Sequence, residues 1–71
     1  MRFEIHEEYD NSDPDKIPST RLKKIAKDKT GVERFLKTVA EKNLWLYIVY
    51  EIDDEDCLIT STRGDEQIWD L

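Results

Sequence analysis

The residues of this chain that could take part in chemistry are its seventeen acids, His6 and Cys57. Two carboxyl groups can act as general acid and base, a histidine can move protons, and a thiolate can attack an electrophile. Each role needs a partner at a defined distance, and no motif places one beside His6 or Cys57. Carboxylate pairs occur by chance in any chain this acidic. The sequence therefore predicts no catalytic residue and a protein that is not an enzyme, with His6 on a strand surface and Cys57 in the core.

Binding of a cation is a second use of carboxylates, and the run Asp53-Asp54-Glu55-Asp56 concentrates oxygen ligands. The spacing of an EF-hand loop, with its glycine and its glutamate at position twelve, is absent. A single cysteine and a single histidine are too few for a zinc site of the Cys/His kind. We expect no dedicated metal site and no cofactor.

The charges are segregated along the chain. Residues 16–42 have nine cationic side chains and three acids, whereas the remainder has fourteen acids and only Arg2 and Arg63 as cations. The net charges are +6 and −12, which give the −6 of the whole chain. Separated fields of this kind steer partners. The acidic excess favours a partner with a basic binding site, and disfavours direct binding to nucleic acid or to a membrane.

Length and composition predict one small folded domain over residues 1–71. Only 38% of the residues are apolar, but seven aromatic side chains supply large contact areas. A lone thiol is typical of a reducing compartment. No apolar run is long enough to span a membrane, and the chain begins without the apolar segment of a secretory signal. We expect a cytoplasmic protein.

Two strand regions have to position the acids. Residues 2–9 alternate, with Phe3 and Ile5 on one side and polar residues on the other, as in a half-buried strand. Residues 44–52 are aromatic and β-branched, which is typical of a central strand. The four acids that follow predict a turn, and residues 57–62 predict the returning strand of a hairpin.

The loops and the end of the chain have weaker signals. Residues 10–18 contain two prolines and several turn formers and predict a loop. Residues 66–71 predict a short edge strand, or a tail held by Ile68 and Trp69.

The basic segment predicts a helix. Apolar residues recur at helical spacing from Leu22 to Ala40, and Ser19 or Thr20 could cap the start. Gly31 interrupts this pattern, so we expect a kink or break near residues 28–31 and an end at Asn43. The fold class is α+β: a small antiparallel sheet of three or four strands (β-α-β-β) packed on a kinked or broken helix.

The central strand is apolar on both faces, but one helix layer covers only one face of a sheet. That face could hold Leu46, Ile48, Tyr50 and Ile52, or else Trp45, Tyr47 and Val49. A second copy could cover the other face, since Trp and Tyr are enriched at interface cores. We expect a homodimer packed through the sheet or through an edge strand, with Trp45, Tyr47 and Val49 as its contact. The alternative places Trp45 and Tyr47 under the helix and the tail.

Acids on strands and turns are the predicted partner-binding residues. Duplex DNA has about one charge per 1.7 Å of its axis, so a domain about 30 Å across would need about eighteen charges to match it. Fourteen acids outside the basic segment come close to this number. The alternative is that turn acids only add solubility. The predicted set is Glu4, Glu7, Glu8, Asp10, Asp13, Asp15, Asp53, Asp54, Glu55 and Asp56.

In size, charge and β-α-β-β pattern, the chain resembles the small acidic proteins that bacteriophages use during host takeover. These proteins mimic DNA, and they share no motif from which a residue could be carried over. The resemblance implies a non-enzymatic inhibitor in the host cytoplasm that competitively blocks a basic DNA-binding protein of a bacterial host, such as an HU-type nucleoid-associated protein. It also requires the basic helices to face away from the acids.

Two other functions use the same residues differently. A protein-protein adaptor or regulatory subunit would dock through the aromatic sheet, with the acids only as solubilising groups. A nucleic-acid-binding module would use the basic helix, but no interleaved aromatic residue supports base stacking there. We therefore expect the acidic surface or the aromatic sheet to carry the function.

Overall fold

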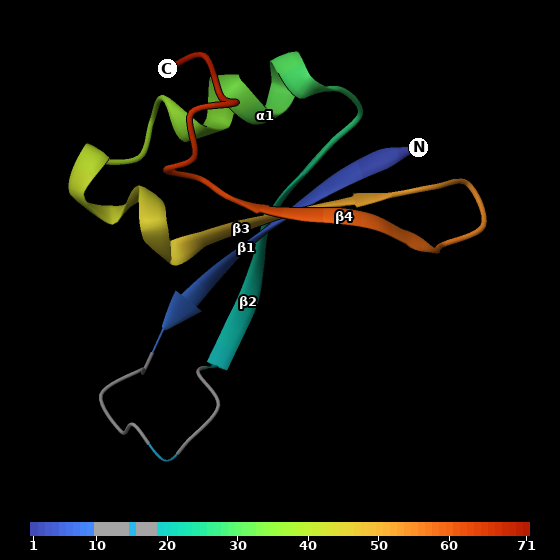
Figure 1. Cartoon of the computed structure of the whole chain (residues 1–71), viewed down its shortest axis with the longest axis horizontal. Coiled ribbons are helices and arrows are strands. Elements are labelled where there is room, and N and C mark those ends of the chain that lie inside the picture. Colours follow the sequence, from blue (N-terminus) through green and yellow to red (C-terminus); the bar gives the residue numbers. More distant parts are fainter. Residues whose placement is uncertain (10–14, 16–18) are drawn as a thin grey trace.

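A four-stranded antiparallel sheet with one covered face forms the protein in a computed structural model, which describes residues 1–9, 15 and 19–71. The strand order is β2-β1-β3-β4, and the helices lie on one side of the sheet (Figure 1). The α+β class and the small antiparallel sheet are as predicted. The elements are β1 (Arg2–Tyr9), β2 (Ser19–Ala26), α1 (Lys29–Leu36), the 3₁₀ helix η1 (Glu41–Leu46), β3 (Tyr47–Ile52) and β4 (Leu58–Arg63).

Strand β1 has the predicted bounds and lies between β2 and β3. Its alternation sets the two faces of the sheet. Ile5 is fully buried opposite Val49 on β3, and Phe3 packs against the same core. Polar residues of β1 alternate with these two and lie on the opposite face.

The helix predicted from Ser19 or Thr20 is wrong, because residues 19–26 form strand β2. Leu22 and Ile25 are three residues apart, a spacing that fits one face of a helix. In the structure Leu22 pairs with His6 and Ile25 with Glu4, with a register shift between Ile5 and His6. The extra residue of this bulge, Lys23, puts two residues three apart on the same face of a strand.

The only α-helix in the described part of the chain begins later than predicted. Asp28 is its N-cap, and its Oδ1 accepts a 2.8 Å hydrogen bond from the Gly31 amide. The predicted break near residues 28–31 is therefore where the chain changes from strand to helix. Val32 and Leu36 are buried, and α1 ends at Leu36 rather than Asn43. Residues 41–46 form η1, so the strand predicted from Leu44 begins at Tyr47.

The predicted hairpin between β3 and β4 is present. Asp53 Oδ1 accepts hydrogen bonds from the amides of Glu55 and Cys57, each 2.9 Å long, which folds the turn. Asp56 has a positive φ of 62°, a conformation that aspartate tolerates better than most residues. Cys57 is exposed at this turn, so its predicted core position is wrong.

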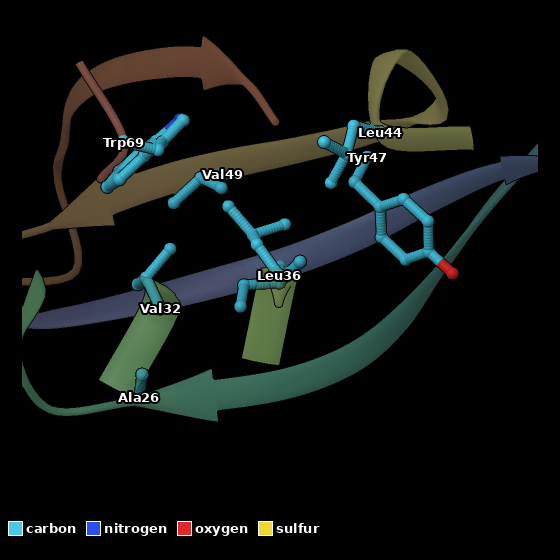
Figure 2. Close-up of a cluster of buried hydrophobic side chains, with 8 residues drawn as sticks. Ala26, Val32, Leu36, Leu44, Tyr47, Val49 and Trp69 are labelled. Atoms are coloured by element: carbon cyan, nitrogen blue, oxygen red, sulfur yellow. The ribbon is translucent and has the colours of Figure 1, made fainter. Parts of the chain in front are cut away.

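The core lies between the covered face of the sheet and α1, with side chains from β1, β2, α1, η1, β3 and the C-terminal tail (Figure 2). Trp69 is only 7% exposed, and its Nε1–H donates a 2.9 Å hydrogen bond to the Arg63 carbonyl. Ile68 is 52% exposed. Residues 66–71 therefore form a tail that Trp69 holds in place, and not an edge strand.

Among the described residues, no helix is long and apolar enough to cross a membrane. Asp15 lies in a turn and is exposed. The other residues of the predicted loop, 10–14 and 16–18, lie outside the described residues, and these include Asp10 and Asp13.

Candidate binding surfaces

One face of the sheet is left uncovered by the described elements. The core side chains Ile5, Val49 and Trp69 lie on the covered face with α1. The strand register places the other set of side chains on the far face, which we call the open face. The open face consists of Thr20, Leu22 and Ile25 on β2, Arg2, Glu4, His6 and Glu8 on β1, Ile48, Tyr50 and Ile52 on β3, and Leu58, Ser61 and Arg63 on β4.

The predicted dimer contact does not form one surface. Tyr47 and Val49 are 8% and 2% exposed and belong to the core, so their side chains are not available to a second copy. Trp45 lies on η1, outside the sheet, and is 49% exposed. The alternative prediction was right for Tyr47 and wrong for Trp45. The face of β3 that remains uncovered is the one with Ile48, Tyr50 and Ile52.

Polar residues of β1 form a row of ion pairs and hydrogen bonds across the open face. Arg2 Nε is 2.9 Å from Glu4 Oε2, and His6 Nε2 is 3.2 Å from Glu4 Oε1. Arg63 Nη1 reaches Glu8 Oε1 at 2.8 Å. Hydrogen bonds from Arg2 and then from His6 lower the pKa of the Glu4 carboxyl group. The His6 ring also meets Tyr50 edge-on, with centroids 5.1 Å apart.

The Glu7 side chain points to the covered side of the sheet and, like Glu4 and Glu8, has partners within the chain. Arg21 Nη2 lies 2.8 Å from Glu7 Oε1, and the Tyr47 hydroxyl donates a 2.9 Å hydrogen bond to Oε2. These two partners, Arg21 first, lower the pKa of Glu7, while burial and the Glu7 carboxylate raise the pKa of Tyr47. Glu4, Glu7 and Glu8 are therefore neutralised within the chain. This corrects their predicted role as phosphate-like groups, since each is bound to a cation and its side chain is only 12–20% exposed.

Three of the four acids in the turn of the β3–β4 hairpin are exposed. We call Asp53, Asp54, Glu55 and Asp56 the acidic turn. Asp54 and Asp56 side chains are 90% and 76% exposed, and they pair with the amino terminus and with Arg2 respectively. The amino terminus lowers the pKa of Asp54. Glu55 forms no ion pair with any residue that the structure describes.

Charge is segregated across the sheet rather than between a helix and a sheet. Edge strand β2 has three cations and no acid, whereas residues 47–63 of the β3–β4 hairpin have five acids and one arginine. The cationic strand lies directly beside β1, and Arg21 binds Glu7 across this boundary. The expectation that the basic segment faces away from the acids as a helix is therefore wrong.

Within the described residues, no three His, Cys, Asp or Glu side chains are grouped so that they could hold a metal ion. His6 contacts Glu4 and Tyr50, and Cys57 Sγ contacts only the Glu55 carbonyl, at 3.8 Å, among the polar groups that the structure describes.

No known protein family, curated protein or solved structure matches this chain. The arrangement of these surfaces therefore has to support any proposal about function.

Proposed function

We propose that the protein is a non-enzymatic acidic binding protein that works as a homodimer. Two copies join through their open faces, and the acidic turns, which remain in solvent, bind a basic partner. The observation that carries this proposal is the self-complementarity of the open face over β1, β2 and β3, where the central side chains of each row match one another when the row is reversed.

The charged row on β1 shows this relation. A two-fold axis that lies in the interface, perpendicular to β1 and level with Ile5, reverses the strand in the second copy. Glu4 of one copy then faces His6 of the other, and His6 faces Glu4. At the ends of the row, Arg2 faces Glu8. Arg2 and Glu8 therefore meet as opposite charges at the ends of the row, and Glu4 and His6 meet as hydrogen-bonding partners at its centre, an arrangement that favours this register over shifted ones.

The apolar rows on β2 and β3 are also self-complementary about this two-fold axis. Leu22 and Ile25 pair with His6 and Glu4 across β1 and β2, so the axis sets Leu22 of one copy against Ile25 of the other. On β3, Ile48 and Tyr50 pair with the same two residues, so Ile48 meets Tyr50. Leu22 and Ile25 are 48% and 52% exposed in the single chain, and burial of this apolar area favours association.

The dimer keeps both acidic turns accessible. The axis reverses the strands, so the two turns lie at opposite ends of the dimer. Their carboxylates can imitate DNA phosphates and pair with lysines and arginines that otherwise hold the backbone. The proposed partner is a basic DNA-binding protein in the cytoplasm of a bacterial host, such as an HU-type nucleoid-associated protein, and the proposed effect is competitive inhibition of the kind that bacteriophage proteins exert.

Displacement of DNA tests this function. Fluorescently labelled duplex DNA is bound to a purified HU-type protein at low salt, and the acidic protein is added while anisotropy is measured. We expect release of the DNA, and a loss of release as salt rises, because screening weakens exposed ion pairs. Absence of release at any protein concentration up to about a hundred times that of the DNA would contradict the proposal.

Paired variants locate the binding residues. Asp54→Lys with Glu55→Lys should raise the protein concentration needed for half-maximal DNA release at least about tenfold, because these side chains face solvent at the acidic turn. Asp53 is left intact because its carboxylate folds the turn. The control, Asp65→Lys with Asp70→Lys, makes the same charge change elsewhere and should alter that concentration less than about threefold. Equal effects of the two pairs would show that only net charge matters.

An adaptor that docks its open face on a different protein is the second candidate. The uncovered Tyr50, Ile48 and Leu22 favour it, because aromatic and aliphatic side chains dominate interface cores. Such a contact would survive high salt and would not be displaced by DNA. A chain that stays monomeric, does not release DNA and binds a partner through Tyr50 in high salt would favour the adaptor over the acidic dimer.

A further inference from the structure

A groove of about 670 Å³ lies between β2 and α1, on the covered side of the sheet. Ala26 and Gly31 lie in its wall, and Phe35 of α1 is half-buried in it. Grooves of about 300–1,000 Å³ are typical of sites for small molecules. The dimer interface and the acidic turn do not include these residues, so the groove is independent of the proposed function.

Three cations line this groove. Lys24 comes from β2, Lys27 from the connection to α1, and Arg34 from the helix. All three are exposed, and none takes part in an ion pair within residues 1–9, 15 and 19–71. By contrast, Arg2, Arg21 and Arg63 each bind a carboxylate. The groove therefore has positive charge that the described residues do not neutralise, in a chain whose net charge is negative.

The acid in the groove does not cancel this charge. Asp28 is the single carboxylate among the lining residues, and its Oδ1 accepts the hydrogen bond from the Gly31 amide that caps α1. Three cations against one engaged carboxylate leave a positive field in a concave site, where low-dielectric walls strengthen it. An anion is the charge type that this site attracts.

The apolar part of the groove adds a second requirement on the ligand. The Phe35 ring contacts Tyr47 edge-on, with centroids 5.9 Å apart, which fixes its orientation. A flat ring can pack on an aromatic side chain while the charged end of the same molecule meets the cations. Arg34 can bind two phosphate oxygens at once, and the lysines act as mobile point charges.

We propose that the groove binds a small organic phosphate that combines an aromatic ring with two or more negative charges. Nucleoside triphosphates have this chemistry. Lys24, Lys27 and Arg34 hold the phosphates, and Phe35 supplies the surface for the ring. Inorganic polyphosphate shares the charge but lacks the ring, which allows the two contributions to be separated.

A titration with three probes tests the proposal on the full chain. ATP, tripolyphosphate and adenosine are added without divalent cations, and two-dimensional NMR follows the Gly31 amide and the Phe35 ring. We expect both signals to shift with ATP, with affinity at least about tenfold higher than for either other probe, because charge and ring act together. Equal affinities for ATP and tripolyphosphate would refute the ring contact, and no shift at millimolar ATP would refute the site.

Matched variants separate the groove from general charge attraction. Lys24→Glu with Arg34→Glu should reduce ATP affinity at least about tenfold, whereas Lys23→Glu with Lys37→Glu, an equal charge change outside the groove, should reduce it less than about threefold. Lys24→Gln with Arg34→Gln repeats the test without new acids, in case the first variant unfolds. Equal losses in the groove and control variants would show that ATP follows net charge, which overturns the proposal.

Discussion

The Tyr47 hydroxyl donates a 2.9 Å hydrogen bond to Glu7 Oε2 on the neighbouring strand. This bond joins the buried core to the edge of the sheet, because Tyr47 is 8% exposed and Glu7 also binds Arg21 of β2. Three of the four strands thus meet at one carboxylate. The basic strand β2 is tied to the acidic strand β1 by this group as well as by the backbone.

Removal of that hydroxyl should loosen the junction. We expect Tyr47→Phe to lower the free energy of unfolding by about 1.5–3 kcal/mol, the usual net value of a hydrogen bond to a charged group. The pKa of Glu7 should rise towards its ordinary value, because one of the groups that lower it is lost. Urea denaturation and an NMR titration measure the two effects. Tyr9→Phe is the control, and an equal loss in both variants would contradict this role.

Acid should destabilise the protein through Glu4 and Glu7. Both have a lowered pKa in the folded state, so the unfolded chain binds more protons as pH falls. Their contribution is complete above the ordinary carboxyl pKa of 4.5 and is lost as pH falls through the lowered values. We expect the urea midpoint to fall steeply between about pH 5 and about pH 3.

The variant Glu4→Gln with Glu7→Gln serves as the reference for this pH dependence. It should be less stable than the natural chain at neutral pH and should show a shallower fall in acid, because the titrating groups are gone. Identical slopes for the two proteins, measured at one fixed concentration, would assign the acid sensitivity to other carboxylates.

The two glycines should respond differently to alanine. A Cβ at Gly64 would lie 2.7 Å from the Leu44 carbonyl oxygen and 3.2 Å from Leu36 Cδ2. Backbone cannot move aside cheaply, so we expect Gly64→Ala to cost about 1–3 kcal/mol. Gly31→Ala meets only side chains closely, at 3.1 Å from Ala26 Cβ, and gains helix propensity, so its change should stay within about 1 kcal/mol. Thermal unfolding compares them, and equal losses would contradict the close approach at Gly64.

The tail should depend on Trp69 and not on Ile68. Trp69→Ala removes a buried ring and should cost about 3–5 kcal/mol, which is enough to unfold a domain of this size. Trp69→Phe keeps most of the volume and loses the hydrogen bond to Arg63, for about 1 kcal/mol. Ile68→Ala, at a side chain 52% exposed, should change stability by less than about 1 kcal/mol. Chemical denaturation ranks the three, and an Ile68 effect as large as that of Trp69 would contradict this anchor.

Local sequence patterns predict the fold where the strand is regular. Phe3 and Ile5 alternate with polar residues, and β1 has the bounds that this alternation indicates. The four acids after Ile52 predict the hairpin turn for the same reason, since turn chemistry is local. The same reasoning does not predict the bulge at Lys23. The bulge gives Leu22 and Ile25 a helical spacing on a strand, and only the pairing with β1 reveals it.

The site is harder to predict because its contacts join distant parts of the chain. Glu7 meets Arg21 and Tyr47, and Glu8 meets Arg63, so acids that look available in the sequence are already paired. Which face of β3 is covered depends on where α1 packs. The alternation of Tyr47 to Ile52 allows either choice, so the sequence could define the two candidate faces but not choose between them.

Sedimentation equilibrium of three proteins tests the homodimer through the open face most directly. We predict that the measured mass of the natural protein is twice the 8.5 kDa of one chain, and that the variant Leu22→Asp with Ile25→Asp has the mass of a single chain. The control, Ile68→Asp with Leu71→Asp, replaces residues of similar exposure away from the open face and should remain dimeric. A natural chain that stays at 8.5 kDa up to hundreds of micromolar, or a control that dissociates equally, would contradict the account.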